Sequence, residues 1–437
     1  MKVLSLFDGM ACGMIAMLNA GIEVESYDAY EIDKYAIKVS SHNFPNIRHH
    51  GDVFQADFTQ YEGADYLVGG SPCTYWSIAQ KNNRETEASG MGWELFSQYV
   101  RAVREAKPKF FIYENNKSMS AAIRQSIDSA FGFEAVCINS ALVSAQNRQR
   151  LYWVGMRNED GTYSKVPVEQ PEDRGILLKD VLNNAIAWRD KAHAYTTRCQ
   201  SAAIEDTLAK HRHTMVAEPI NMTSNGKSQC IRATYYKDGI RNLIANNFDV
   251  RTCVAEAVDP FDIVPFVEER LDKAVDKYGY LPTMWNPYNN AEITGKAPTL
   301  TAQCASQTKS ATVMMICCAV PCEWDNNGKP IKAVSSADGK THAAYEVKDG
   351  QITIKGKQYP VNLPDGYYIF RKLTVTECMR LQTVPEWYDF SVISDSQAYK
   401  CLGNGWTCDV ITHLINATQT VARRKWLDDL LGDCLCD

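Results

Sequence analysis

The chain has 437 residues, of which 45% are hydrophobic and 22% are charged, a composition typical of a globular protein. Because domains usually hold roughly 100–200 residues, this length predicts more than one lobe and excludes a single small binding module. The net charge is −6, from 46 Lys and Arg against 52 Asp and Glu, which argues against a protein that coats nucleic acid with its whole surface. A local basic face stays compatible with this charge.

The cysteines and the apolar stretches indicate a soluble, reduced protein. The 15 cysteines are scattered along the chain. The sequence begins with MKVLSLFDG, which lacks the basic start, apolar run and small-residue cleavage site typical of a secretory signal peptide. The longest apolar stretch, Val313 to Cys322, is much shorter than the roughly 20 residues of a membrane span. Cys317, Cys318 and Cys322 lack a second ligand pair at zinc spacing, so we predict neither a metal site nor membrane association.

Short apolar runs alternate with amphipathic stretches in the N-terminal part of the chain, the pattern of β-α-β units around a mainly parallel sheet. The predicted strands are Lys2–Phe7, Val24–Tyr30, Ala64–Gly70 and Lys109–Asn115, and the predicted helices are Met14–Ala20, Asp33–Phe44 and Trp93–Ala106. Polar residues follow these strands at their carboxyl ends, where open α/β sheets bind ligands. The sequence therefore predicts a site at this edge.

The pattern changes at about Leu182, where helical periodicity fades and hairpin signals such as Asp349-Gly350 indicate β structure. Arg189 to Arg251 contains ten Lys or Arg, six Asp or Glu and three His, a local basic excess that a solvated surface would also produce. Compact α/β patterning returns near Tyr367, with helices predicted at Thr374–Gln382 and Thr407–Trp426. We expect a catalytic and cofactor-binding lobe at 1–181, an inserted lobe at 182–366 and a returning segment at 367–437.

Three features at strand ends indicate a nucleoside cofactor. The segment FDGMACG (Phe7 to Gly13) lies between a strand and a helix, where a ligand can approach the backbone. Glu31 follows the second strand, where a carboxylate can accept hydrogen bonds from ribose hydroxyls, and Asp52 follows a third junction. The phosphate-binding pattern GxxxxGK[ST] does not occur, which argues against a nucleoside triphosphate.

Four further residues could carry chemistry. Cys73 lies in the loop GGSPCTYWS after a strand, where an exposed thiolate could attack an electron-poor carbon, although most cysteines are inert core residues. Glu114 ends the next strand and could protonate a ring nitrogen. Arg148 and Arg150 are two apart on an extended segment, so both point to one side and suit an electron-rich oxygen or a phosphate.

Taken in chain order, these segments resemble the motifs of the cytosine-5 DNA methyltransferase family, and the resemblance covers both ends of the chain. The arrangement of the segments is that of bacterial and phage members, whereas the residues of the FDGMACG and GSPC motifs are similar to those of the animal de novo subgroup. The matching segments are LFDGMACG, YEIDKYA with Glu31, GDV with Asp52, GGSPCTYWS with Cys73, Glu114-Asn115, Gln146-x-Arg148-x-Arg150, RKLTVTECMRLQTVPEWY and SQAYKCLGNGW.

The resemblance implies an α/β, S-adenosylmethionine-dependent methyltransferase (Rossmann-like) fold with a mixed, mainly parallel sheet, plus an inserted smaller β or irregular target-recognition lobe. It implies methyl transfer from S-adenosyl-L-methionine to C5 of a flipped-out cytosine in a specific sequence of double-stranded DNA. Cys73 would add to C6 and Glu114 would assist at N3, while Arg150, with Arg148 nearby, would hold O2. The implied cofactor-binding residues are Phe7, Asp8, Gly9, Gly13, Glu31, Ile32, Asp52, Val53, Pro72, Asn404 and Trp406.

Three positions carry residues other than those usual in the family. Thr74 stands where Gln is usual, Asn116 where Val is usual, and Gly405-Trp406 where Ser-Val is usual. We expect an active enzyme despite these departures, because none removes the nucleophile, the proton donor or the arginine pair. The sharper alternative is that Gly405-Trp406 reshapes the cofactor pocket.

Other functions stay open at this point. An RNA cytosine-5 methyltransferase is one alternative, although the Cys-Phe-Thr segment of that branch does not occur. A catalytically inactive DNA-binding relative is another, which the intact Cys73, Glu114 and Arg150 disfavour. Amino methylation of cytosine would need none of these three residues. We further expect action as a monomer in the cytoplasm of a bacterium or a phage-infected host, with any cognate restriction endonuclease on another chain.

Overall fold

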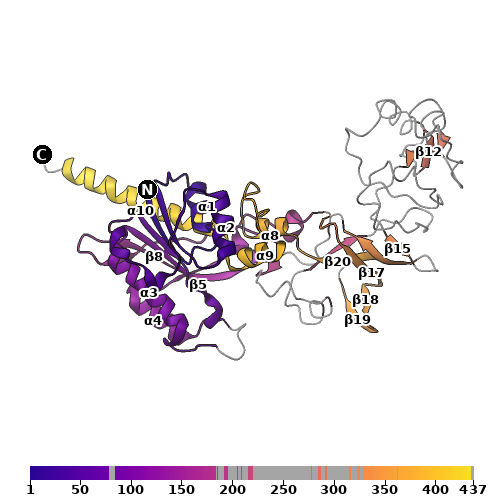
Figure 1. The fold of residues 1–437 in the computed structure, drawn as a ribbon, viewed down its shortest axis with the longest axis horizontal. Helices are drawn as coiled ribbons and strands as arrows, with labels where there is room; N and C mark the ends of the chain where they lie inside the picture. The colour runs from indigo at the N-terminus through magenta and orange to yellow at the C-terminus, as the bar shows by residue number, and fades with distance from the viewer. Residues whose placement is uncertain are drawn as a thin grey trace.

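The computed structural model describes residues 1–77, 84–183, 185, 191–194, 215–219, 329–335, 337–361 and 363–434, with short isolated pieces between 204 and 324. These residues form two main sheets, one of eight strands covered by helices and one of seven strands beside it (Figure 1). None of the described helices is long and apolar enough to cross a membrane.

The eight-stranded sheet has the strand order β3-β2-β1-β4-β5-β8-β6, with β9 paired to β8. Strands β1 to β5 run parallel, whereas β8 is antiparallel to both β5 and β6. The chain order reverses on either side of β1, which creates a topological switch point where ligands bind. This arrangement confirms the predicted α/β fold with a mixed, mainly parallel sheet. The strands are β1 (Lys2–Leu6), β2 (Ser26–Tyr30), β3 (Arg48–His49), β4 (Tyr66–Gly69), β5 (Phe110–Asn116), β6 (Val136–Asn139), β8 (Gln149–Arg157) and β9 (Tyr163–Lys165).

Helices cover both faces of this sheet because the buried strands are apolar on both sides. In β5, Ile112 packs into one core, and Phe111 and Tyr113 pack into the other. Burying such a side chain stabilises the fold by about 1.5–3 kcal/mol. The first core is shared with α1 (Cys12–Asn19), α2 (Lys34–Asn43), α8 (Val375–Leu381), α9 (Asp395–Asn404) and α10 (Cys408–Cys434), and the second with α3 (Gly90–Ala106) and α4 (Ala121–Phe131).

Side-chain caps fix where several helices begin. The Asp33 carboxylate accepts the Tyr35 backbone N–H at 2.9 Å and starts α2, and Ser120 accepts the Ile123 N–H at 3.2 Å and starts α4. Helix α4 ends at Gly132, whose φ of 82° lies in the left-handed region. Helix α10 runs across the sheet beside α1, and its C-terminal end projects from the body (Figure 1). Both ends of the chain therefore build the same helix-covered sheet.

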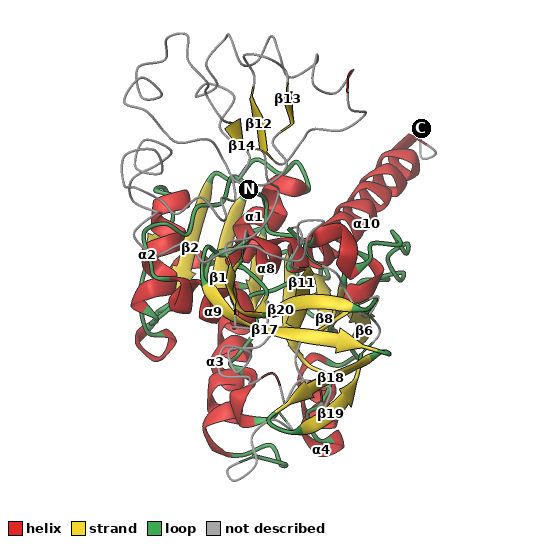
Figure 2. Ribbon diagram, turned by 90° about the vertical axis from the view of Figure 1, so that its right-hand side faces the viewer, coloured by secondary structure: helices red, strands yellow, loops and turns green. Residues whose placement is uncertain are grey.

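The second sheet is antiparallel; β18 pairs with β17, and β19 pairs with β18 (Figure 2). The predicted hairpin turn is confirmed: Asp349 and Gly350 have φ of 51° and 68°, as a two-residue turn between β17 and β18 requires. The strands are β11 (Met215–Pro219), β15 (Cys322–Trp324), β16 (Pro330–Val334), β17 (Thr341–Lys348), β18 (Gln351–Ile354), β19 (Lys357–Pro360) and β20 (Gly366–Lys372).

Small pairings complete the described part of the chain. Strand β7 (Gln146–Asn147) pairs with β10 (Ala192–His193), and β12 (Met284–Asn286) pairs with β13 (Ala291–Glu292) and β14 (Met314–Met315). Most of the basic stretch from 189 to 251 lies outside the described residues, as do Cys317 and Cys318. The division at 181/182 and 366/367 stays a prediction; β20, which spans the second boundary, pairs with β11 and β17.

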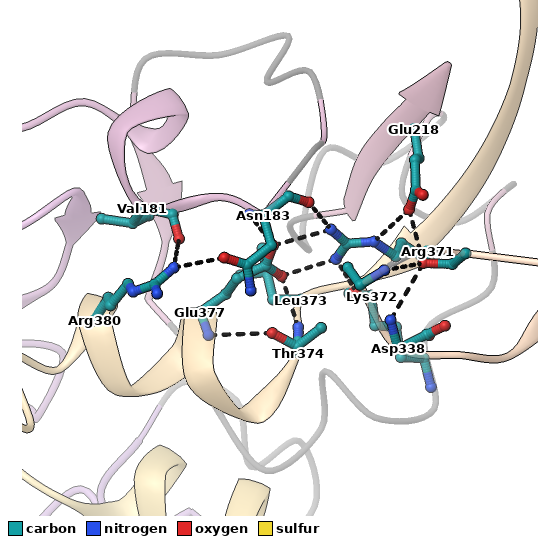
Figure 3. Close-up of polar contacts among 12 residues, drawn as sticks. Val181, Asn183, Glu218, Asp338, Arg371, Lys372, Leu373, Thr374, Glu377 and Arg380 are labelled. Carbon is teal, nitrogen blue, oxygen red and sulfur yellow. Dashed lines mark hydrogen bonds and ion pairs between the residues drawn. The ribbon is translucent and has the colours of Figure 1, made fainter. Parts of the chain in front are cut away.

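A buried charge cluster links the second sheet to α8 (Figure 3). Arg371 of β20 donates two hydrogen bonds to Glu377 of α8, at 2.8 and 2.9 Å, and one to Glu218 of β11 at 3.2 Å. Its guanidinium also donates to the Asn183 carbonyl oxygen at 2.8 Å. The exposed fractions of the three charged side chains are 0%, 0% and 3%. Because these charges are paired and hydrogen-bonded, the cluster fixes how β11 and β20 meet α8.

Candidate active site

The sheet register brings the predicted site residues to one edge. Leu6 at the end of β1 pairs with Tyr30 of β2 and Gly69 of β4, so the segments that begin at Phe7, Glu31 and Gly70 leave the sheet side by side. Strand β8 is antiparallel, so its first residues lie at this same edge, where Arg150 pairs with Asn116 of β5. Residues from five strands are thereby assembled although they lie far apart in the sequence.

The loop after β1 presents a buried carboxylate. Oδ1 of Asp8 accepts hydrogen bonds from Ser5 Oγ at 2.6 Å and Tyr27 Oη at 2.7 Å, whereas its buried Oδ2 has no hydrogen-bond partner among the described residues. Burial raises the pKa of Asp8 to about 6; the hydrogen bonds from Ser5 and Tyr27 lower it and the Glu31 charge raises it. An orphaned carboxylate oxygen at a ligand-binding edge suits a cationic ligand.

Glu31 fixes the geometry of the same loop. Its Oε2 accepts the Gly9 backbone N–H at 2.8 Å, and its Oε1 accepts the N–H groups of Ile32 and Asp33, both at 2.8 Å. Gly9 has a φ of 60°, and Phe7, with a φ of 57°, is also in the left-handed region. The carboxylate thus connects the ends of β1 and β2, where a ribose is expected.

The remaining cofactor-binding candidates surround this loop. Ile32 is 76% exposed, unusual for a large apolar side chain, and is available to contact a flat ring. Asp52 is exposed and accepts the Phe54 N–H at 3.0 Å, while Val53 is buried. Pro72 and Asn404 are exposed at the β4 loop and at the end of α9.

Cys73 lies in a short turn after β4 (Cys73–Tyr75) and is partly exposed. Two hydrogen bonds hold the loop before Cys73. Ser71 Oγ lies 2.6 Å from Tyr113 Oη, and Asn115 donates to the Ser71 carbonyl oxygen at 3.1 Å. In contrast, burial raises the pKa of the Cys401 thiol to about 12. Cys73 is therefore the thiol of this edge that a substrate can reach.

Glu114 faces this loop from β5. A Cβ added at Gly70 would lie 2.8 Å from both the Glu114 carbonyl oxygen and Oε2, so only glycine permits this close approach. Oε1 of Glu114 pairs with Arg150 Nε at 3.0 Å, and Oε2 accepts a hydrogen bond from Trp406 Nε1 at 3.0 Å. The three predicted residues Cys73, Glu114 and Arg150 thus lie together, and Trp406 joins them from the C-terminal segment.

Arg148 has different hydrogen-bond partners from Arg150. Strand β8 begins only at Gln149, and the buried Arg148 side chain donates to the carbonyl oxygens of Gly403 and Gly405, at 3.2 and 2.9 Å. Burial lowers the pKa of Arg148 to about 10, and the neighbouring Arg150 charge lowers it as well. Gln146 is also buried and donates to the Leu381 carbonyl oxygen at 3.1 Å. Two residues of this motif thus contact the returning C-terminal segment.

Sequence reasoning missed two contacts made by unusual residues. Trp406 was assigned to the cofactor pocket alone, yet its N–H reaches Glu114 across 292 positions in the chain. Asn116, which replaces the usual valine, donates to the Cys73 carbonyl oxygen at 3.4 Å and accepts from Ser118 Oγ at 2.8 Å. Both residues differ from those usual in the family, and this difference could have indicated the contacts. Each introduces a side-chain hydrogen-bond donor where the usual valine has none.

The donor set of this edge fits S-adenosylmethionine. Asp8 offers an unsatisfied negative charge for a cation, and Glu31 stands where a ribose is expected. In the described part of the chain no group of three or more His, Cys, Asp or Glu residues is placed to hold a metal ion.

Comparison with known proteins agrees with this geometry. A family model described as C-5 cytosine-specific DNA methylase matches residues 1–420. The orphan methyltransferase M.SPRI of Bacillus phage SPR is 33% identical over 171 residues, which is 36% of this chain and 38% of that protein. The type II methyltransferase M1.ScrFI of Lactococcus lactis subsp. cremoris is 28% identical over 263 residues, 56% of this chain and 64% of that protein.

Each of these two alignments spans less than two thirds of the relative. Among solved structures, the Entamoeba histolytica methyltransferase EhMeth has a TM-score of 0.44 at 12% identity, over 95% of this chain and 96% of that chain. The match of the family model to nearly the whole chain confirms the resemblance predicted from the motifs. The chain belongs to the C-5 cytosine-specific DNA methylase family.

Proposed function

We propose that this protein transfers a methyl group from S-adenosyl-L-methionine to C5 of cytosine in double-stranded DNA. The observation that carries this proposal is the position of Glu114, which is held by Arg150 and Trp406 directly against the Cys73 loop. A thiol, a carboxyl group and a guanidinium at one edge of the sheet form the set that activates a cytosine ring.

The first step overcomes the weak nucleophilicity of cytosine C5. The Cys73 thiolate forms a bond to C6, the C5–C6 π electrons move to the C4–C5 bond, and the C4–N3 π electrons take a proton at N3 from the protonated Glu114 carboxyl group. The product is an enamine with a nucleophilic C5. Arg150 donates to the base O2, where electron density increases during addition. After C5 is methylated, a base removes its proton, Cys73 leaves by β-elimination, and the N3 proton returns to Glu114.

The cofactor would be held by the loop after β1 and the ends of β2 and β3. When bound, S-adenosylmethionine supplies an electrophilic methyl group on a sulfonium ion. Asp8 would balance positive charge, Glu31 would accept the ribose hydroxyls, and Ile32 with Asp52 would contact the adenine. Since Arg148 is buried against the Gly403 and Gly405 carbonyls, we assign it to holding the C-terminal turn rather than the base.

The target cytosine must leave the DNA stack, because Cys73 cannot reach C6 inside a duplex. This flip costs a few kcal/mol, which contacts in the pocket and with the recognition lobe offset. We propose that the lobe at 182–366 makes the sequence-specific contacts, with its basic stretch on the phosphates. Action as a monomer, a cytoplasmic location and a separate restriction endonuclease stay predictions.

The test is bisulfite sequencing of DNA from a methylation-free host that expresses the protein, beside a Cys73→Ala control. Cytosines protected in one short sequence context, and unprotected in the control, would support the proposal. Protection of RNA cytosines alone would favour the RNA alternative, and DNA binding without protection in either nucleic acid would favour an inactive relative.

A further inference from the structure

Trp406 connects the cofactor loop to the proposed proton donor. Its indole Nε1 donates to Glu114 Oε2 at 3.0 Å, and Arg150 Nε lies 3.0 Å from Oε1 of the same carboxylate. The last torsion of a glutamate side chain is broad, so a carboxylate held at one oxygen can still rotate. With a donor from a different part of the chain on each oxygen, the orientation of Glu114 is fixed.

The backbone on both sides of Trp406 is held by buried hydrogen bonds. Gln382 donates from Nε2 to the Leu402 carbonyl oxygen at 2.7 Å and accepts the Cys408 N–H at its own carbonyl at 2.9 Å. Arg148 donates to the Gly405 carbonyl oxygen at 2.9 Å. The turn that carries the indole is therefore held by hydrogen bonds on both sides of Trp406.

The ring itself is also confined. A Cβ added at Gly13 would lie 3.8 Å from Trp406 Cζ3, so the benzo edge of the indole lies against the first turn of α1. A Cβ at Gly405 would lie 3.2 Å from Cys12 Sγ, so a side chain at this position would press the turn against the neighbouring thiol. The glycine before Trp406, where the family usually has serine, thus keeps the turn clear of the Cys12 thiol.

The chemistry of an indole suits this position. Its N–H is a donor only, so it cannot remove a proton from Glu114 or compete with the base for one. A carboxylate oxygen has two acceptor sites, and each oxygen of Glu114 keeps one that Trp406 and Arg150 do not use. Valine, the usual residue here, has no polar hydrogen and would leave Oε2 without this donor.

We infer that Trp406 is a positioning residue that aims the Glu114 carboxyl group at N3 of the cytosine, in addition to lining the cofactor site. This inference rests on the proposed methyl transfer. It separates two roles for one side chain: loss of the N–H alone should slow addition at C6, whereas loss of the ring surface should weaken cofactor binding.

The exchange of cytosine H5 with water isolates the first role, because it needs addition and elimination but no cofactor. Cys73 bonds to C6, Glu114 protonates N3, C5 gains a solvent proton and loses its original hydrogen, and Cys73 and the N3 proton then leave. Release of tritium from [5-³H]cytosine DNA, measured without cofactor, follows this cycle. We expect Trp406→Phe to slow release about tenfold or more, with kcat for methylation lowered in parallel; the KM for the cofactor should stay nearly unchanged only in a replacement that keeps the bicyclic ring surface.

The matched control is Trp426→Phe, at a tryptophan of α10 that is 60% exposed and for which no contact with the site residues is described. It should leave exchange unchanged. Replacing Trp406 by β-(3-benzothienyl)alanine keeps the ring shape and removes only the N–H, which guards against a folding defect in the phenylalanine variant. Slow exchange in this analogue supports the inference.

Wild-type exchange in the benzothienyl analogue, or a raised cofactor KM with normal exchange in Trp406→Phe, would overturn the inference and leave the proposed function intact. If the wild-type protein neither exchanges H5 nor methylates DNA, the proposed function is wrong, and the inference is then wrong as well because it rests on that function.

Discussion

Replacing Arg371 by methionine should strongly destabilise the protein. The Arg371 side chain is fully buried, and its removal takes away the ion-pair partner of Glu377, which is also fully buried, and one ion-pair partner of Glu218, which is 3% exposed. Breaking a buried pair in this way costs about 3–5 kcal/mol, which is roughly two to four orders of magnitude in the unfolding equilibrium. Ser335 Oγ donates to Glu218 and the Asn183 N–H donates to Glu377, but these neutral donors do not replace the charge of the guanidinium.

Equilibrium unfolding in urea measures this loss. Tryptophan fluorescence and circular dichroism should be followed together, because coincident transitions are needed to derive one free energy of unfolding. The double variant Arg371→Met with Glu377→Gln should recover part of the stability, since it also removes the buried charge of Glu377.

Lys340→Met is the matched control. Lys340 and Asp395 form an exposed ion pair at 3.5 Å, with side-chain exposures of 63% and 67%, and such pairs contribute about 1 kcal/mol or less. A destabilisation of Arg371→Met no larger than that of Lys340→Met would refute the reasoning that the buried cluster holds the second sheet to α8.

Three further predictions follow from the site. Cys73→Ala should abolish methyl transfer and leave the DNA dissociation constant nearly unchanged, as measured by methyl incorporation and by fluorescence anisotropy. Gly70→Ala should lower kcat by about tenfold or more, because its Cβ would lie 2.8 Å from Glu114 Oε2; circular dichroism would show an intact fold. Asp8→Asn should change the pH dependence of stability: burial raises the pKa of Asp8 from 3.8 to about 6, so folding favours its protonated form and wild-type stability falls by up to about 3 kcal/mol as the pH rises from 4 to 6. Denaturation midpoints measured from pH 4 to 7 should show the stability of Asp8→Asn rising relative to that of the wild type. Parallel curves for the two proteins would contradict the raised pKa of Asp8.

The sequence predicted the sheet and the residues at its edge, because both depend on local patterns. Apolar runs that end in polar residues placed Glu31 and Glu114 at the carboxyl ends of β2 and β5, as the structure has them. The hairpin at Asp349-Gly350 was predicted by its turn residues, which tolerate positive φ.

Contacts between distant segments could not be predicted in this way. The bonds from Trp406 to Glu114 and from Arg371 to Glu218 join residues 292 and 153 positions apart, and no local periodicity encodes them. The strand pattern predicts Arg148 and Arg150 on one side, but it does not reveal that Arg148 donates to the Gly405 carbonyl oxygen while Arg150 pairs with Glu114.

Covalent trapping on DNA tests the central claim most directly. A duplex carrying 5-fluorocytosine at the methylated position should form a stable adduct with the protein in the presence of S-adenosylmethionine, because fluorine at C5 cannot be removed as a proton. The account predicts one adduct per chain, located at Cys73 by peptide mass spectrometry and absent from Cys73→Ala. Methylation of the normal duplex without any adduct at Cys73 would contradict it.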